Sequence, residues 1–223
     1  MNYEFPKLEH SLYVISTPIG NMQDISNRSL KILSESDYIL CEDTRVTSKL
    51  LNFYNIKNKL VSYHISNEKF KTKEIIDDLK CKKIISLVSD AGTPTLSDPG
   101  KNLVTKCYEQ GIKVTPVPGA SAILSAVSVS GFVDNFYFCG FFPKKKNEIM
   151  NFLSKIKLIK ATLVFFMPAR DLGKNSEYLT KFFPCSIFLI AREMTKVHET
   201  YIRDTMTNIK KYIQNNVKGE MTL

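Results

Sequence analysis

The sequence predicts an α/β protein of two domains, the first built on a mainly parallel sheet and the second on a mixed sheet. Short apolar or β-branched runs alternate with longer segments of helical period, which is typical of strands connected by helices. A break near Pro118 and Gly119 separates two such series, so we expect domains over residues 1–117 and 118–223. With 223 residues, 43% of them hydrophobic, the chain is long enough to bury a core in each domain.

Each predicted strand is a short apolar or β-branched run. Those of the first domain are LYVIS (12–16), DYILC (37–41), KLVSYHI (59–65), KIISLV (83–88) and KVTPV (113–117). Those of the second are FYFCGFF (136–142), TLVFFM (162–167), SIFLIA (186–191), a stretch near HETYI (198–202) and EMTL (220–223). A helix is expected to begin after Ser26, a residue favoured at the N-cap. The helix before the fifth strand is expected to end at Gly111, a common helix stop.

The loop SDAGTPTLSDPG, residues 89–100, follows the predicted strand KIISLV. Gly92 and Gly100 permit backbone angles that a Cβ forbids. Pro94 and Pro99 fix φ and remove a hydrogen-bond donor, so neither a strand nor a helix continues through the loop. Loops at the carboxyl ends of parallel strands are where open α/β folds bind ligands. The loop therefore predicts either a ligand site or a tight turn without a ligand.

The charge of the chain is positive and unevenly spread. Lys and Arg outnumber Asp and Glu by 31 to 22, a net charge of +9. Residues 1–118 hold 16 basic and 14 acidic side chains, whereas residues 119–223 hold 15 and 8. A positive face attracts partners rich in phosphate, which favours nucleic acid; a solvated, lysine-rich surface is the alternative.

Several classes of protein lack support in the sequence. No apolar run approaches the roughly 20 residues that a membrane span needs, and the start MNYEFPKLEH lacks the order of a secretory signal, so we expect a cytoplasmic protein. The five cysteines are odd in number without a C-x-x-C pair, which indicates reduced, mostly buried thiols. The three histidines have no metal spacing, and no metal is expected. The signatures G-x-G-x-x-G, G-x-x-x-x-G-K-[ST] and G-x-S-x-G are absent.

Eight short motifs occur along the chain in one order and spacing. They are STPIGNMQDIS (16–26), CEDTR (41–45), HISNE (64–68), SDAGTP (89–94), VPGASA (117–122), GFFPKKK (140–146), AREMTK (191–196) and KGEM (218–221). Together they resemble the tetrapyrrole methylase superfamily, and within it the branch that methylates the ribose 2′-oxygen of a cytidine in small-subunit ribosomal RNA. The resemblance implies the two-domain tetrapyrrole methylase fold, S-adenosylmethionine as methyl donor in a cleft between the domains, and a homodimer. The implied partner is small-subunit ribosomal RNA or the 30S subunit, and neither DNA nor a membrane.

Carried over position by position, the resemblance assigns cofactor contacts mostly to small residues at strand ends and in loops. They are Pro18, Gly20, Asp90, Ala91, Gly92, Thr93, Pro94, Ser121, Ala122, Met167 and Glu220. Small residues let the backbone approach an adenosine and a methionine closely, so that main-chain N–H and C=O groups read their polar edges. A helix cap is the alternative for Ser121, and a place in the core is the alternative for Met167.

Methyl transfer to a ribose hydroxyl is helped by a base near this poor acid and by a cation near the developing negative charge. Asp43 and Arg45 of CEDTR follow the second predicted strand, where an α/β site is expected, and are the candidates for these roles. A cap and ion pair that start the next helix are the alternative. His64 is a third catalytic candidate. The candidates for RNA contact, unless they are a solvated run, are Lys144, Lys145 and Lys146.

The chain departs from the pattern of this branch at three places. Where the branch has Y-E-S-P-H-R, this chain reads FFMPAR (165–170), with Met167 at the position of the Glu and Ala169 at that of the His. Ser66 stands where a second His is usual, and the chain stops at Leu223, so the last strand is expected to be short. A non-catalytic RNA- or ribosome-binding relative is one alternative function, which the altered segment 165–170 favours. Methylation of a small tetrapyrrole is another, which the basic second half disfavours.

Overall fold

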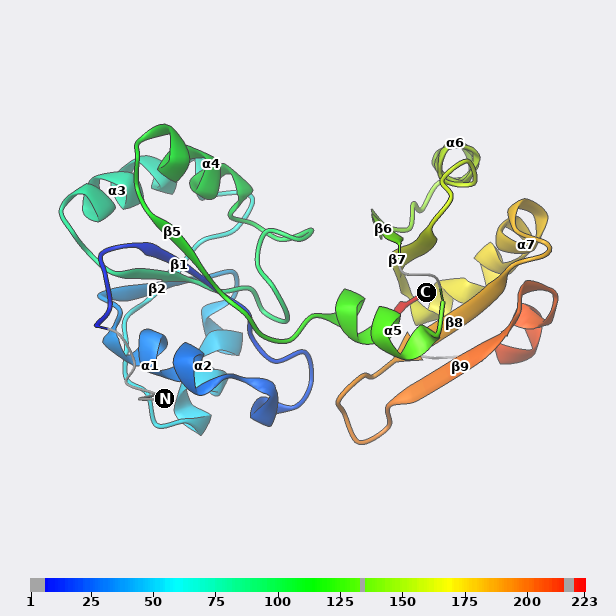
Figure 1. The fold of residues 1–223 in the computed structure, drawn as a ribbon, viewed down its shortest axis with the longest axis horizontal. Coiled ribbons are helices and arrows are strands. Elements are labelled where there is room, and N and C mark those ends of the chain that lie inside the picture. Colours follow the sequence, from blue (N-terminus) through cyan, green and yellow to red (C-terminus); the bar gives the residue numbers. More distant parts are fainter. Residues whose placement is uncertain (1–6, 133–134, 215–218) are drawn as a thin grey trace. The chain divides into compact units, whose positions relative to one another are not determined.

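The computed structural model describes residues 7–132, 135–214 and 219–223 (Figure 1). The chain divides into two compact units, Met1–Ser121 and Ala122–Leu223, which we name unit 1 and unit 2 and describe one at a time. Unit 1 holds a five-stranded parallel sheet and unit 2 a five-stranded mixed sheet, so the predicted α/β class is confirmed.

The sheet of unit 1 has its strands in the order β3-β2-β4-β1-β5, and each neighbouring pair is parallel. The strands are β1 (Leu12–Ile15), β2 (Tyr38–Cys41), β3 (Leu60–Ser62), β4 (Ile85–Leu87) and β5 (Val114–Val117). The helices are α1 (Asn27–Glu35), α2 (Thr44–Phe53), α3 (Glu68–Lys80) and α4 (Lys101–Glu109), with a short 3-10 helix η1 (Met22–Asp24).

Two apolar clusters cover the two faces of this sheet. Figure 1 shows α3 and α4 on one face and α1 and α2 on the other. Leu40 of β2 packs in the cluster that contains Ile76 of α3 and Leu103 of α4. Its neighbour Ile39 packs in the cluster that contains Leu33 of α1. Successive residues of a strand point to opposite faces, so β2 contributes to both clusters and is buried throughout.

Two helix ends in unit 1 depend on single residues that the sequence analysis named. Ser26 Oγ accepts a hydrogen bond from Ser29 N–H at 3.0 Å and caps α1. Gly111, just past α4, has a φ of +66°, the left-handed conformation that commonly follows a helix. Both predicted helix signals are confirmed.

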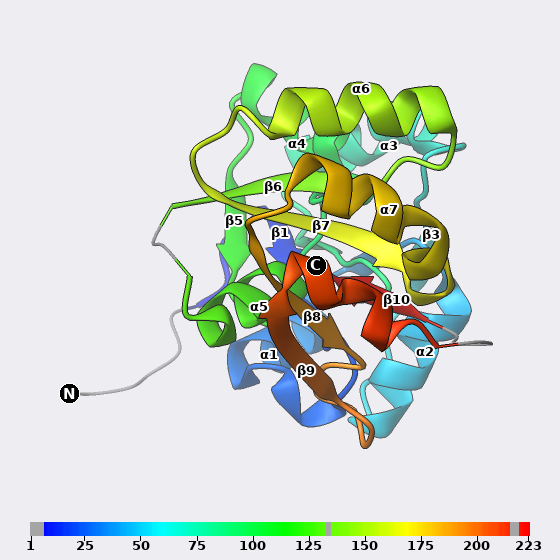
Figure 2. The same cartoon turned by 90° about the vertical axis from the view of Figure 1, so that its right-hand side faces the viewer.

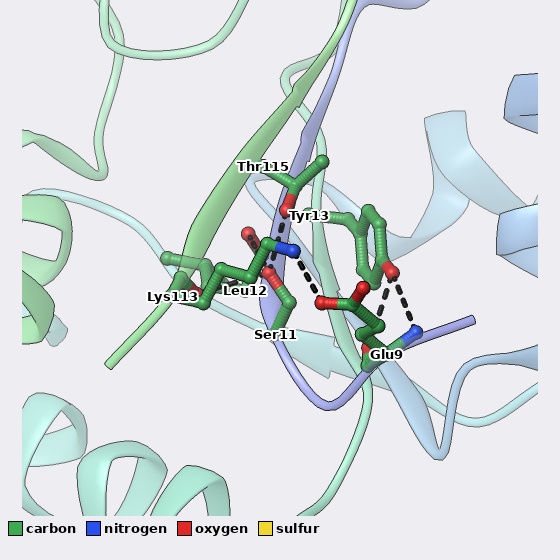
Figure 3. A network of polar contacts seen from close by, with 6 residues as sticks. All are labelled: Glu9, Ser11, Leu12, Tyr13, Lys113 and Thr115. Carbon is green, nitrogen blue, oxygen red and sulfur yellow. Dashed lines mark hydrogen bonds and ion pairs between the residues drawn. The ribbon is translucent and has the colours of Figure 1, made fainter. Parts of the chain in front are cut away.

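A polar network lies at the amino-terminal edge of unit 1, where β1 and β5 begin (Figure 3). Ser11 Oγ lies 2.9 Å from Thr115 Oγ1 and donates to Lys113 O at 3.0 Å. Tyr13 Oη donates to Glu9 O at 3.0 Å, and the Glu9 carboxylate forms an ion pair with Lys113. The network ties the start of β1 to the start of β5.

The sheet of unit 2 has its strands in the order β6-β7-β10-β8-β9 (Figure 2). β6 runs parallel to β7, whereas β10 is antiparallel to both β7 and β8, and β9 is antiparallel to β8. The strands are β6 (Phe136–Phe141), β7 (Thr162–Pro168), β8 (Ile187–Arg192), β9 (Thr200–Thr205) and β10 (Glu220–Thr222). The helices are α5 (Ala122–Ser130), α6 (Lys146–Ile156) and α7 (Leu172–Phe182), with 3-10 helices η2 (Ala169–Asp171) and η3 (Met206–Tyr212).

One apolar cluster forms the core of unit 2. Phe165 of β7 and Phe188 of β8 pack there with Leu153 of α6 and Leu179 of α7. Helix α5 contacts β7, β8 and β10, and its Ala126 is buried outside that cluster. The central strands β7 and β8 are therefore covered by helices on both faces.

The five cysteines are free thiols, as expected, but the expectation that most of them are buried is wrong. Cys41 in β2 and Cys107 in α4 are buried, and Cys139 is half-buried. Cys81 and Cys185 are exposed. Cys81 directly follows α3 and Cys185 lies in the turn before β8, and segments of this kind run over the surface.

Within the described ranges, no helix is both long enough and apolar enough to cross a membrane. The same residues contain no group of three or more His, Cys, Asp or Glu side chains placed to hold a metal ion.

Candidate functional site

The carboxyl ends of the unit 1 strands lie at one edge of the sheet, because all the strands are parallel. We name this edge, with the segments that follow the strands, the carboxyl edge. In parallel sheets ligands bind at such an edge. It brings together the predicted site residues of unit 1, which are Pro18, Gly20, Asp43, Arg45, His64, Asp90, Ala91, Gly92, Thr93, Pro94 and Ser121.

Hydrogen bonds connect the loop after β4 to the segment after β1. Thr17 N–H donates to Gly92 O at 2.9 Å, and Gly92 N–H donates to Thr17 O at 3.0 Å. Thr17 Oγ1 also donates to Ser89 O at 3.0 Å. Gly92 has a φ of +85° at this position, a backbone angle that residues with a Cβ rarely adopt. The glycine therefore sets the shape of the loop.

The segment after β5 joins the same arrangement. Thr93 Oγ1 lies 2.8 Å from Ser16 Oγ and donates to Ala120 O at 3.3 Å. A Cβ built on Gly119 would stand only 2.9 Å from Ser16 Cβ, so this close approach needs a glycine. The loops after β1, β4 and β5 are thus held together by hydrogen bonds and by packing.

Only part of the predicted cofactor set in unit 1 is open to solvent. Both backbone polar groups of Gly92 are bonded to Thr17, so ligand contacts at this loop fall to its neighbours. The exposed residues of the set are Gly20, Asp90 and Ala91. The half-buried residue is Thr93, and the buried ones are Pro18, Gly92, Pro94 and Ser121.

Asp43 and Arg45 form a closely bonded pair at the start of α2. Asp43 Oδ1 accepts the Arg45 N–H at 2.8 Å and so caps the helix. The guanidinium of Arg45 donates to Asp43 Oδ2 from Nη2 at 2.6 Å and to Oδ1 from Nε at 3.0 Å. Hydrogen bonds from the Arg45 side chain, and then from its backbone, lower the pKa of Asp43 to about 2. The cap and ion pair that the sequence left as an alternative are both present.

Glu42 is a second carboxylate at this edge, and it is not among the predicted site residues. It is half-buried, and burial is the main cause that raises its pKa. The negative charges of Asp90 and Asp43 raise it further, while His64 acts in the opposite direction. The residue Asp90 is exposed, yet its pKa is raised too, because partial desolvation of the carboxylate outweighs the Asp43 N–H that its Oδ1 accepts at 3.1 Å. The position of Glu42 directly after β2 was the signal that could have found it.

His64 follows β3 and is held by Asn67. Its backbone N–H donates to Asn67 Oδ1 at 2.9 Å, and its Nε2 lies 3.1 Å from Asn67 Nδ2. The amide therefore orients the ring of His64, which acts electrostatically on Glu42.

Met167 lies in the core of unit 2. Its side chain is fully buried among the apolar cluster. Asn175 Nδ2 donates to Met167 Sδ at 3.2 Å, and Asn175 Oδ1 is buried without a hydrogen-bond partner among the described residues. Sulfur is a weak acceptor, so Met167 satisfies this amide poorly. The side chain has the core position that the sequence left as an alternative.

The other predicted residues of unit 2 fall at several places. Ala122 is the first residue of α5. Glu220 is exposed on β10, where it stands opposite Pro168 of β7. Lys218, which begins the KGEM motif, lies outside the described residues.

The lysine run consists of Lys144, Lys145 and Lys146 and lies at the start of α6, whose first residue is Lys146. Its three side chains are exposed, and Lys145 Nζ lies 3.4 Å from Glu148 Oε1. The positive end of a helix dipole lies at its N-terminus, where cations are unfavourable. Apart from the ion pair between Lys145 and Glu148, the charges of the run are therefore unfavourable to α6.

Comparison with known proteins places this architecture in a family. The model described as Tetrapyrrole (Corrin/Porphyrin) Methylases matches residues 11–210. The chain therefore belongs to the tetrapyrrole methylase family.

Three of the relatives that carry the name ribosomal RNA small subunit methyltransferase I show how far the likeness extends. The one from Thermotoga maritima is 45% identical over 215 residues, which cover 95% of this chain and 96% of the relative. The one from Mesomycoplasma conjunctivae is 43% identical, covering 94% of this chain and 88% of the relative. The one from Halalkalibacterium halodurans is 40% identical, covering 96% and 74%. The resemblance found in the eight motifs is confirmed.

Structures of two other proteins share the fold. Diphthine synthase superposes with a TM-score of 0.71 at 17% identity, covering 95% of this chain and 88% of that chain. Uroporphyrin-III-C-methyltransferase from Thermus thermophilus gives a TM-score of 0.64 at 16% identity, covering 96% and 93%. At these identities the likeness concerns the fold alone.

Proposed function

We propose that this protein methylates small-subunit ribosomal RNA, with S-adenosylmethionine as donor and the 2′-oxygen of a cytidine ribose as acceptor. The observation that carries the proposal is the 45% identity, over 215 residues, with a relative named ribosomal RNA small subunit methyltransferase I. The finer assignment of the acceptor atom is supported by TPIGN, EDTR, SDAGTP and ARE-x-TK, which resemble the cytidine branch.

The carboxyl edge suits a cofactor that combines a flat base, a ribose and an amino acid. Gly20 and Ala91 are exposed and carry at most a methyl side chain, so a ligand can approach their backbone closely. When bound, S-adenosylmethionine supplies the electrophilic methyl group. Gly20, Asp90 and Ala91 would hold it, with Gly92 keeping the loop of Asp90 and Ala91 in shape. The further residues of the proposed set are Pro18, Thr93, Pro94, Ser121, Ala122 and Glu220.

The acidic and basic side chains of the carboxyl edge have different proposed roles in removing the ribose proton. A base works best with a pKa near the working pH, and Asp43, with a pKa of about 2, is too weak for that role. Glu42, whose pKa burial raises, is the better acceptor for the ribose proton. Asp43 then positions Arg45, whose cation stabilises negative charge on the acceptor oxygen. His64 completes the proposed catalytic group beside Glu42.

A pH profile tests the role of Glu42. Only its ionised carboxylate takes a proton, so methylation is expected to fall as the pH drops through its pKa, which lies above the ordinary value for a glutamate. Glu42→Gln is expected to lower the rate and to remove this acid limb. Single-turnover methylation rates, measured across the pH range in which both chains stay folded, check this. A variant with the full rate and the parent profile would place the proton acceptor elsewhere.

The lysine run is the proposed RNA contact. Its three cations are exposed at a helix start, where the helix dipole disfavours them. The edge strand β6 ends just before the run and carries exposed aromatic rings, among them Phe136 and Phe141. Exposed rings stack on unpaired bases, and lysines neutralise phosphates. The two features together suit a single-stranded stretch of RNA.

Salt dependence tests the lysine run. Replacing Lys144, Lys145 and Lys146 by Gln is expected to weaken RNA binding and to make the plot of log affinity against log salt shallower by up to about 3 units, because fewer counterions are released. Titrations of labelled small-subunit RNA at several salt concentrations measure the slope. The matched control replaces three exposed lysines of the same unit, Lys155, Lys160 and Lys181, by Gln. Equal slopes for the two triple variants would mean that the run is solvated surface.

Labelled S-adenosylmethionine tests the function itself. We expect label in unmodified small subunits or their RNA, at a cytidine 2′-oxygen, and none in a matching DNA, which lacks that hydroxyl. Label in a tetrapyrrole instead would show macrocycle methylation, and RNA binding without label would show a non-catalytic relative. Light scattering of the same preparation tests the predicted homodimer.

A further inference from the structure

Two large apolar side chains are exposed where β3 leads into α3, close in the chain to His64 (Figure 1). Ile65 is 71% exposed and Phe70 is 84% exposed. A single exposed apolar side chain is common on soluble proteins and needs no explanation. Two of them next to a proposed catalytic residue indicate a contact surface. We name residues 65–73, which carry them, the α3 start.

Hydrogen bonds fix the backbone that carries Phe70. Its N–H donates to Asn67 O at 3.1 Å, and Asn67 Nδ2 donates to Ser62 O, at the end of β3, at 3.2 Å. The next residue, Lys71, donates from Nζ to the same Ser62 O at 2.8 Å. The ring of Phe70 therefore projects from a backbone that is tied to the sheet. Such an anchored position lowers the conformational entropy that is lost when a ligand binds.

The exposed charges next to Phe70 are positive. Lys69 and Lys73 are exposed, whereas Ile75 and Ile76 of the same helix are buried against the sheet. Among the residues that the structure describes, neither Lys69 nor Lys73 forms an ion pair. Lys69 lies in the first turn of α3, where the helix dipole disfavours a cation.

The carboxylates of α3 lie apart from this exposed surface or further along the helix. Glu68, in the first turn, is half-buried. The exposed Glu74 and Asp77 come after Lys73. Residues 68–73 thus present an aromatic ring and two cations to solvent, without an exposed carboxylate.

We propose that the α3 start binds an unpaired stretch of the substrate RNA, with one base stacked on Phe70, Ile65 in apolar contact beside it, and phosphates at Lys69 and Lys73. Aromatic rings stack on unpaired bases of any identity, and lysines neutralise phosphates. Because His64 directly precedes this surface, the bound nucleotides lie close to the one that is methylated. The inference rests on the proposed function for the identity of the RNA.

A second copy of this chain is the other partner that exposed apolar side chains could meet. In a symmetric dimer contact centred here, the α3 start of one copy faces that of the other. Lys69 and Lys73 would then lie near their own counterparts, and like charges facing each other are unfavourable. The charge of this surface therefore favours RNA.

Fluorescence of a single indole tests the stacking. The chain has no tryptophan, so Phe70→Trp introduces the only one. Single-stranded oligocytidylate RNA is expected to quench its emission, because a stacked base quenches an indole, and the same RNA paired with its complement is expected to quench it much less. Tyr108→Trp is the matched control. Tyr108 is 68% exposed near the end of α4, at the edge of the sheet opposite to the carboxyl edge, and its emission should not change.

Affinity for the same labelled RNA gives the second readout. Phe70→Ala is expected to weaken binding about tenfold, and Tyr108→Ala is expected to leave it unchanged. Equal quenching of the two indoles, or parent affinity in Phe70→Ala, would overturn the proposal. A dimer that Phe70→Ala turns into a monomer in light scattering would overturn it too, since the ring would then face a second copy.

The outcomes separate this surface from the proposed function. Methylated small subunits together with an unquenched Phe70→Trp indole would remove the surface and leave the function in place. Quenching and a weaker Phe70→Ala complex, without methyl transfer by the parent chain, would keep the surface and remove the function.

Discussion

Gly92→Val is expected to lower the affinity for S-adenosylmethionine by at least about 100-fold, a change of about 2.7 kcal/mol. The left-handed φ of +85° at Gly92 is unfavourable for a β-branched residue. The strain falls on the pair of hydrogen bonds between Gly92 and Thr17, which hold the exposed residues Asp90 and Ala91 in place. Calorimetric titration of the folded variant with S-adenosylmethionine measures the loss.

Gly111→Val is the matched control for this prediction. Gly111 also has a positive φ, +66°, and its added Cβ meets nothing within 4 Å. It precedes β5, at the edge of the sheet opposite to the loops after the strands. Both variants carry backbone strain, so a comparable loss of stability is expected in each, whereas only Gly92→Val should lose the cofactor. Unchanged affinity in a folded Gly92→Val protein would remove this loop from the site.

Asp43→Asn is expected to reduce methylation about 100-fold while the affinity for S-adenosylmethionine stays nearly the same. Asparagine is as good an N-cap as aspartate, so α2 keeps its start. What is lost is the carboxylate that holds the Arg45 guanidinium through hydrogen bonds of 2.6 and 3.0 Å. Arg45 then no longer has a fixed position near the acceptor oxygen. Single-turnover rates and cofactor titrations, measured on one preparation, separate the two quantities.

Asp77→Asn supplies the comparison for Asp43→Asn. Asp77 is an exposed carboxylate on α3, and its loss changes the net charge equally. It is expected to leave the methylation rate at the parent value. Near-normal turnover in Asp43→Asn would reduce Asp43 to the cap and ion pair that start α2.

Most strand positions could be predicted because most strands are compact apolar runs with turn residues on both sides. TLVFFM, for example, became β7 (Thr162–Pro168), one residue longer than the run. The order of the strands in the sheets could not be predicted in the same way. That β1 lies between β4 and β5 depends on which distant segments pair, and periodicity within a run carries no information about its neighbours.

The positions of several site residues could be predicted from the sequence, but the chemical role of each residue could not. The motif CEDTR placed Asp43 and Arg45 after β2, where they lie. The low pKa of Asp43 comes from hydrogen-bond geometry, and the raised pKa of Glu42 comes from burial and from Asp90, far along the chain. Such causes exist only once the loops are assembled. The core position of Met167 likewise depends on tertiary packing.

The pairing of β1 with β5 has a consequence for the order of events during synthesis. Ser11 Oγ donates a hydrogen bond to Lys113 O at 3.0 Å, and the two residues are 102 positions apart in the sequence. β1 has β4 and β5 as its neighbours, so neither edge of it can be covered until most of unit 1 has left the ribosome. Contacts of such long range slow folding, because the chain must close a large loop before it gains them. An early nascent chain therefore carries an apolar strand with two open edges, and this is the interval in which chaperones matter most.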